Sequence, residues 1–134
     1  MASTQNVKQA KILVVDDEEL NLFLLEEILD AEGYSNVTFL SSPNQALEDY
    51  QQNTYDLILL DLKMPEIDGF EFMKHMREFD KPCPPILILT ASADDETRAK
   101  VINMNAQGII SKPFDHDNIL SVIEELVTHH WNKH

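Results

Sequence analysis

Residues 56–61 read Asp-Leu-Ile-Leu-Leu-Asp, and this short apolar run with an acid at its end decides the fold. Residues 11–17, Lys-Ile-Leu-Val-Val-Asp-Asp, repeat the same arrangement. Short continuous apolar runs are typical of parallel strands that are buried on both faces of a sheet. Because the carboxyl ends of parallel strands meet at one edge, we expect Asp16, Asp17 and Asp61 to lie close together.

Strand and helix patterns alternate along the rest of the chain. Strands are expected at 12–16, 37–40, 56–61, 86–90 and 108–111, and helices at 19–31, 44–51, 70–77, 95–105 and 116–127. Such alternation predicts an α/β fold with a five-stranded parallel sheet in the order 2-1-3-4-5 and helices on both faces. This is the doubly wound, flavodoxin-like arrangement, which places ligands beyond the carboxyl ends of the strands.

The length of 134 residues suits a single domain. We expect this domain to cover residues 11–128, with a flexible N-terminus at 1–10 and a flexible tail at 129–134. No apolar stretch approaches the ~18 to 20 residues that span a bilayer, so no membrane contact is expected. The polar opening and the one cysteine predict a cytoplasmic protein.

The charge balance is strongly acidic. Twenty-four acidic residues face ten lysines and arginines, which makes the formal net charge −14. Affinity for nucleic acids comes largely from basic side chains that neutralise phosphates, so direct binding to DNA or RNA is not expected. The acidic excess is compatible with a bound metal ion or a basic partner surface, and equally with an ordinary solvated surface.

Acids that gather at one sheet edge repel each other unless a cation lies among them. Mg2+ prefers oxygen ligands and keeps several waters, so it needs few protein groups. We expect Asp17 and Asp61 to bind Mg2+ directly and Asp16 to act through a water. A backbone carbonyl just beyond Asp61 would complete the protein ligands.

A carboxylate such as Asp61 can also act as a nucleophile toward a phosphoryl group. The transferred group spreads negative charge over three oxygens, which require positioning and neutralisation. Lys112, after the fifth expected strand, can pair with one oxygen. The Thr90 hydroxyl and the Ala91 amide can donate to the other two.

Four segments of the chain resemble the receiver domains of bacterial two-component response regulators, the CheY-like family. They are Val-Val-Asp-Asp-Glu at 14–18, Asp-Leu-Lys-Met-Pro-Glu-Ile-Asp-Gly at 61–69, Thr-Ala at 90–91 and Lys-Pro-Phe at 112–114. The resemblance extends over about residues 11–127. Because four motifs occur in the family's order, it is highly specific.

The resemblance implies that Asp61 accepts a phosphoryl group from a phosphohistidine on a sensor histidine kinase or a histidine phosphotransfer protein. Asp16 and Asp17 match the acidic pair for Mg2+, and Lys63 matches the position whose backbone carbonyl is a ligand. Thr90 and Lys112 match the switch hydroxyl and the lysine of the family, and the Lys112–Pro113 peptide bond is expected to be cis.

The function implied is a phosphorylation-activated switch in a phosphorelay. Its conformational change would control a downstream protein target or output domain, and could produce a phosphorylation-dependent homodimer. The chain would catalyse its own phosphotransfer and dephosphorylation without being a turnover enzyme. Lys63 and Ser92 flank the reacting residues and are expected to tune the lifetime of the adduct.

One switch position departs from the family pattern. Receivers often carry Tyr or Phe three residues before the lysine, where this chain has Ile109. An aliphatic side chain cannot reproduce the inward swing of a ring. We therefore expect the signal to pass through Thr90 and the fourth helix by a different repacking.

The first expected helix places Phe23 among acidic residues rather than on its apolar side. With Leu20 and Leu24, this ring could help to dock a helix of a kinase or phosphotransfer protein. The alternative is that Phe23 packs on a neighbouring helix or is a tolerated exposed ring.

Three other function classes are alternatives for this sequence. A phosphatase of the haloacid-dehalogenase type needs an acid two residues beyond its nucleophile, and Lys63 occupies that place. A nucleotide-binding loop needs clustered glycines, whereas the three glycines here are dispersed. A receiver-like interaction module that works without phosphorylation stays open as the alternative.

Overall fold

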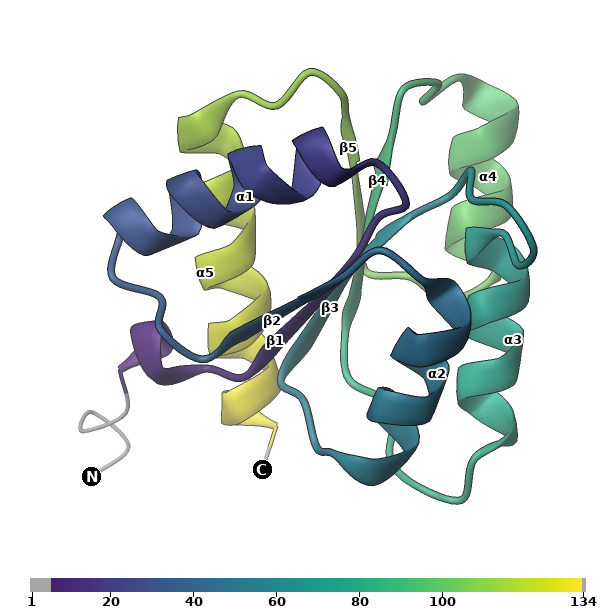
Figure 1. Cartoon of the computed structure of the whole chain (residues 1–134), viewed down its shortest axis with the longest axis horizontal. Helices are drawn as coiled ribbons and strands as arrows, with labels where there is room; N and C mark the ends of the chain where they lie inside the picture. The colour runs from purple at the N-terminus through teal and green to yellow at the C-terminus, as the bar shows by residue number, and fades with distance from the viewer. Residues whose placement is uncertain (1–5, 134) are drawn as a thin grey trace.

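The computed structural model describes residues 6–133 (Figure 1). A short 3-10 helix, Val7–Gln9, precedes five strands that alternate with five helices. The strands are β1 (Ile12–Val15), β2 (Val37–Leu40), β3 (Leu57–Asp61), β4 (Ile86–Thr90) and β5 (Gly108–Ser111). The helices are α1 (Glu19–Ala31), α2 (Pro43–Gln52), α3 (Gly69–Glu78), α4 (Asp95–Asn103) and α5 (His116–Asn132).

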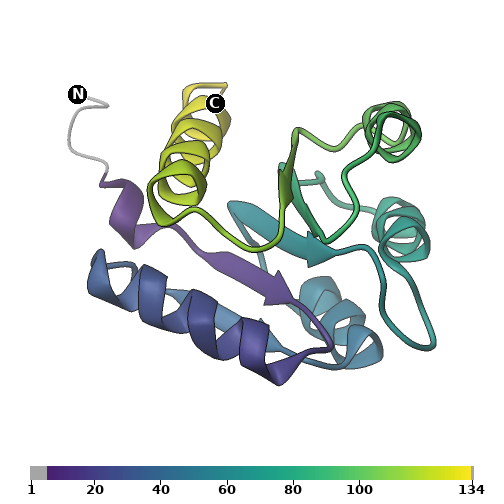
Figure 2. The same ribbon diagram turned by 90° about the horizontal axis from the view of Figure 1, so that it is seen from above.

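The five strands form one parallel sheet in the order β2-β1-β3-β4-β5, which confirms the predicted topology. The register brings Val15 level with Leu60, and Thr90 level with Ser111. Helices α1 and α5 cover one face of the sheet, and α2, α3 and α4 cover the other (Figures 1 and 2). Because the five strands are parallel, their carboxyl ends all lie at the same edge of the sheet.

Alternate side chains of each central strand enter different cores. Ile12 and Val14 of β1 pack in the cluster beneath α1 and α5, whereas Leu13 and Val15 pack in the cluster beneath α2 and α3. All residues of β1, β3 and β4 are buried, as expected for strands that are covered on both faces. This double burial is the reason that their sequences read as unbroken apolar runs.

Local capping determines where several helices begin. Ser42 accepts a hydrogen bond from the Gln45 amide at the start of α2, and Pro43 occupies its first turn. Asp68 and Glu71 form a reciprocal capping box at the start of α3. These starts agree with the sequence prediction to within a residue or two.

The last helix extends further than the predicted range of 116–127. Residues 129–132, expected in a flexible tail, continue helix α5 as far as Asn132. The half-buried Trp131 packs against the core one turn beyond Val127, and its indole Nε1 donates a 3.0 Å hydrogen bond to Asp56 Oδ1. The aliphatic stripe of this helix ends at Val127, and the aromatic residue that extends it was not predicted.

Near the N-terminus, Val7–Gln9 form the 3-10 helix and Val7 packs against the core, a contact that was not predicted. Residues 1–5 and 134 lie outside the described part of the chain. Within residues 6–133, none of the helices combines the length and the apolar character needed to cross a bilayer.

Candidate functional site

Three carboxylates meet where β1 and β3 end. Asp16 and Asp17 follow β1, and Asp61 is the last residue of β3. One carboxylate oxygen from each lies within 4.8 Å of the others. Asp16 is fully buried, Asp61 is 4% exposed and Asp17 is half-buried. The predicted gathering of these acids is confirmed.

The Lys112 ammonium faces these carboxylates from the end of β5. Its Nζ lies 3.0 Å from Asp16 Oδ2, 3.3 Å from Asp61 Oδ1 and 3.8 Å from Glu18 Oε1. The Lys112 amide donates a 2.8 Å hydrogen bond to the Thr90 carbonyl, which ties this loop to β4. The Lys112–Pro113 peptide bond is cis, as predicted.

Burial and crowding change the acidity of two groups at the site. Burial, together with the charges of Asp16 and Asp17, raises the pKa of Asp61 to about 6, although the Lys112 charge and hydrogen bond oppose this. Burial alone would lower the pKa of Lys112, but its contacts with Asp16 and Asp61 outweigh burial and raise that pKa. The lysine therefore stays charged while the acids repel one another.

The donor set fits a divalent cation. Within residues 6–133, Asp17 Oδ1 is buried and receives no hydrogen bond. A buried charged oxygen without a partner is costly, and one ammonium cannot balance three carboxylates. Asp16 is held in place by the Glu18 amide, which donates a 2.9 Å hydrogen bond to its Oδ1. Carboxylate oxygens in this arrangement are the ligands that Mg2+ prefers.

Thr90 ends β4 at the same edge and is 1% exposed. Its Oγ1 accepts a 3.2 Å hydrogen bond from the Ser92 amide, so the hydroxyl is engaged with its own loop. Ala91 is exposed between them. The sequence placed Thr90 correctly, but the pairing with Ser92 depends on the loop conformation and was not predicted.

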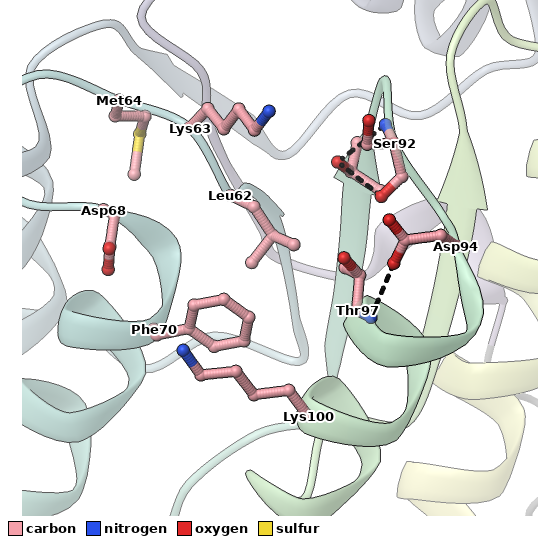
Figure 3. Close-up of a pocket in the computed structure, with 10 residues that line it drawn as sticks. Leu62, Lys63, Met64, Asp68, Phe70, Ser92, Asp94, Thr97 and Lys100 are labelled. Carbon is pink, nitrogen blue, oxygen red and sulfur yellow. Dashed lines mark hydrogen bonds between the residues drawn. The ribbon is translucent and has the colours of Figure 1, made fainter.

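A cavity of about 570 Å³ opens beside this loop, between the segment after Asp61 and helix α4 (Figure 3). Lys63 and Leu62 line it from one side, and Ser92, Asp94 and Thr97 from the other. The hydrogen bond from the Thr97 amide lowers the pKa of Asp94, and the charge of Lys63 adds to this effect. The loop that follows Thr90 thus borders open space.

The segment after Asp61 is held close to helix α3 by Gly69. The Gly69 amide donates a 2.8 Å hydrogen bond to the Leu62 carbonyl. A Cβ atom at Gly69 would lie 2.7 Å from the Asp61 carbonyl oxygen and 2.9 Å from Leu62 Cα, both backbone atoms. The absence of a side chain at this position is therefore a requirement of the site.

The structure also shows the positions of Ile109 and of the apolar residues predicted to dock a partner. Ile109 is half-buried and packs against the cluster beneath α2 and α3. On α1, Leu20, Phe23 and Leu24 are exposed by 69%, 55% and 44%. More than half of the Phe23 side chain is therefore open to solvent, as expected for a surface ring rather than one packed into a neighbouring helix.

One residue beside the site, Glu18, was not predicted from the sequence. Glu18 reaches toward Lys112, and its place directly after Asp16 and Asp17 in the sequence could have indicated a fourth carboxylate near the edge.

Residues 12–124 match the family model of the response regulator receiver domain. This match covers most of the chain and includes all three acids, Thr90 and Lys112. The chain belongs to the response regulator receiver domain family.

Relatives occur as parts of longer proteins. The chain is 36% identical to the transcriptional regulatory protein ZraR of Escherichia coli over 88% of its own length and 26% of that protein. It is 30% identical to the autoinducer 2 sensor kinase/phosphatase LuxQ of Vibrio vulnificus over 92% of its length and 14% of that protein. The chain therefore spans about a quarter or less of these two relatives.

Solved structures agree with the fold. The chemotaxis protein CheY4 of Vibrio cholerae aligns with a TM-score of 0.79 at 30% identity, covering 88% of this chain and 98% of that one. The receiver domain of the sensor histidine kinase PA1611 of Pseudomonas aeruginosa aligns with a TM-score of 0.80 at 26% identity, covering 90% and 98%. In that structure a magnesium ion is coordinated in the active site cleft.

Receiver domains of this family are phosphorylation-activated signalling switches. They are generally not classed as enzymes. The alternative function, an interaction module that works without phosphorylation, is not favoured.

Proposed function

We propose that Asp61 is the phosphoacceptor of this receiver and that the donor is a phosphohistidine on a sensor histidine kinase or a phosphotransfer protein. The observation that carries the proposal is the position of the Asp61 carboxylate, which is buried beside two further acids and 3.3 Å from the Lys112 ammonium. A carboxylate with a purely structural role is not expected among like charges at the edge of a sheet.

In the transfer step, a carboxylate oxygen of Asp61 attacks phosphorus and forms an oxygen–phosphorus bond. The nitrogen–phosphorus bond of the phosphohistidine breaks, and the imidazole nitrogen keeps the electron pair and is protonated. Hydrolysis later transfers the phosphoryl group from Asp61 to water. Because the chain supplies the acceptor itself, it catalyses only its own phosphorylation and dephosphorylation.

Asp16, Asp17, Asp61 and the backbone carbonyl of Lys63 are the groups that would hold Mg2+. When bound, Mg2+ neutralises charge on the transferring phosphoryl oxygens. The buried, unpaired Oδ1 of Asp17 supports this assignment.

Lys112 would contact one phosphoryl oxygen, the Thr90 hydroxyl a second and the Ala91 amide the third. For this, the Thr90 hydroxyl must turn its hydrogen away from the Ser92 carbonyl oxygen, 3.5 Å from Oγ1, while it can keep accepting from the Ser92 amide. Since these contacts exist only with the adduct present, they supply the free energy that shifts the conformational equilibrium. A shift from 1:99 to 99:1 requires about 5.5 kcal/mol.

Intact mass spectrometry tests the acceptor. We expect acetyl phosphate with Mg2+ to add one phosphoryl group to the wild-type chain and none to Asp61→Asn. Asp80→Asn, which alters an exposed aspartate outside the cluster, is the matched control and should be modified like the wild type. Equal modification of Asp61→Asn, or none of the wild type, would remove Asp61 as the acceptor.

The exposed apolar side chains of α1 give the docking surface for the phosphodonor protein. Leu20, Phe23 and Leu24 lie on a helix that also carries Glu26 and Glu27 on its exposed surface. An amphipathic helix with basic residues beside its apolar face would complement this surface.

Acetyl phosphate is a small molecule without a docking helix. Comparing it with a phosphotransfer protein as the donor therefore separates docking from phosphoryl transfer. Phe23→Ala should slow transfer from a phosphorylated phosphotransfer protein and leave the acetyl phosphate rate unchanged. Ile102→Ala, which removes a similarly exposed apolar side chain from α4, is the control and should affect neither rate. Unchanged transfer from both donors in Phe23→Ala would exclude the docking role.

Downstream, the phosphorylated chain would act in the cytoplasm on a protein target or an attached output domain. Ile109 would transmit the change by aliphatic repacking, and Lys63 and Ser92 would set the adduct lifetime.

Phosphorylation would also produce a homodimer. Light scattering with beryllium fluoride, a phosphoryl mimic, tests the homodimer. A mass that stays at 15.4 kDa would exclude it.

A further inference from the structure

Glu18 occupies the N-cap position of α1 without capping the helix. Ser, Thr, Asp or Asn is favoured there because a short side chain can accept a hydrogen bond from the first turn, which stabilises the helix by about 1 kcal/mol. The longer Glu18 side chain forms no such bond in the described structure. A residue that departs from this N-cap preference is expected to have a role other than capping the helix.

The Glu18 carboxylate is directed toward the phosphorylation site instead. Its Oε1 lies 3.8 Å from Lys112 Nζ and accepts a 2.9 Å hydrogen bond from Asn21 Nδ2. Asn21 is half-buried on the first turn of α1 and therefore gives the carboxylate a fixed support. The Glu18 side chain is 66% exposed, whereas Lys112 is 13% exposed.

Lys112 is consequently attracted from two sides. Asp16 and Asp61 attract the ammonium inward, and Glu18 attracts it toward the mouth of the site. The ammonium is closest to the fully buried Asp16, at 3.0 Å, and Glu18 opposes this attraction from 3.8 Å away. A phosphoryl group that forms on Asp61 would lie on the solvent side, and the Glu18 charge favours movement of the ammonium from Asp16 toward it.

We propose that Glu18 is a positioning residue that acts through Lys112, and that Asn21 holds it in place. The inference rests on the proposed role of Asp61 as phosphoacceptor. Glu18 itself does not contact the reacting atoms.

The first test compares phosphorylation rates with acetyl phosphate at saturating Mg2+, so that any change in metal affinity is removed. Glu18→Gln should slow the reaction about threefold, in keeping with a partly exposed ion pair. Asn21→Ala leaves the charge intact and should give a smaller decrease. Glu19→Gln removes an equal charge from the next residue, which makes no ion pair within residues 6–133, and should leave the rate unchanged.

A second test separates positioning from folding. Glu18→Ser should supply the missing cap and raise the melting temperature, yet slow phosphorylation as much as Glu18→Gln. Opposite effects on stability and rate are not expected from a merely structural residue.

The third measurement uses metal-free protein and needs no phosphorylation. The Cε–Hε signal of Lys112 in a carbon–proton NMR spectrum should shift in Glu18→Gln and Asn21→Ala and stay in place in Glu19→Gln. Equal rates in Glu18→Gln and Glu19→Gln, or an unmoved Lys112 signal, would overturn the proposal. A wild type that takes no phosphoryl group would instead refute Asp61 as the acceptor, while the NMR comparison still decides whether Glu18 positions Lys112.

Discussion

Nζ of Lys112 lies 3.3 Å from Oδ1 of Asp61, although 51 positions separate the two residues in the chain. The contact joins the end of β5 to the end of β3 across the intervening strand β4. Both groups are largely buried, so removing either one would leave the other as a poorly hydrated charge without its partner. The same ammonium balances the acids before phosphorylation and is available to a phosphoryl oxygen afterwards.

Replacing Lys112 by Met should destabilise the metal-free protein because it leaves buried carboxylates without a cation. We expect the free energy of unfolding at pH 8 to fall by about 2 to 3 kcal/mol. Urea denaturation measures the change, and Mg2+ should restore part of it. Lys63→Met, which alters an exposed lysine on the neighbouring loop, should change stability by less than about 0.5 kcal/mol. Equal stability of the two variants would contradict the role of Lys112 as counter-ion.

The raised pKa of Asp61 makes stability depend on pH in a defined direction. Its folded pKa of about 6 lies above the ordinary value of 3.8, so the folded state holds this proton more tightly than the unfolded state. The ionised group therefore costs stability fully above pH 6, and the cost disappears as the pH falls toward 3.8. Asp61→Asn should stabilise the metal-free protein by about 1 to 2 kcal/mol at pH 8.

The measurement is urea denaturation of both proteins from pH 8 to pH 4 without divalent ions. The difference between them should shrink through pH 6 and be small near pH 4. A difference that is constant over this range would show that Asp61 does not titrate as described.

Adding a side chain at Gly69 should disturb the phosphorylation site from a distance. The Cβ atom of Gly69→Ala would approach backbone atoms of Asp61 and Leu62, which cannot rotate away. We expect a loss of about 1 to 3 kcal/mol in unfolding free energy and weaker Mg2+ binding. At Gly108 the nearest atom is the end of the Leu87 side chain at 3.1 Å, so Gly108→Ala should leave Mg2+ binding intact. Isothermal titration with Mg2+ distinguishes the variants.

The end of α5 should contribute to stability without affecting phosphorylation. Trp131→Phe removes the 3.0 Å hydrogen bond to Asp56 while keeping an aromatic ring in the core. We expect unfolding free energy to fall by about 1 kcal/mol and the acetyl phosphate rate to stay the same. Thermal melting and intact mass measure the two quantities. A slower rate would mean that this end of α5 is coupled to the site at the opposite edge of the sheet.

Much of the site could be predicted because its residues occupy positions that local patterns define. Asp16, Asp61 and Lys112 each follow an apolar run, and parallel strands bring such ends to one edge whatever the loops do. What could not be predicted depended on contacts between distant segments. The continuation of α5 through Trp131 requires Asp56, and the use of Glu18 requires Lys112, 94 positions away in a different element.

The sequence by itself determined the order of strands and helices, the edge at which ligands bind and the acids that collect there, because periodicity and strand ends are local properties of the chain. Only the tertiary structure decided which oxygen of Asp17 is buried and unpaired, that Thr90 is engaged with Ser92, and how one ammonium is shared among Asp16, Glu18 and Asp61. These features depend on ångström-scale distances between side chains from different elements, and electrostatic energy at such a site changes steeply with distance and burial.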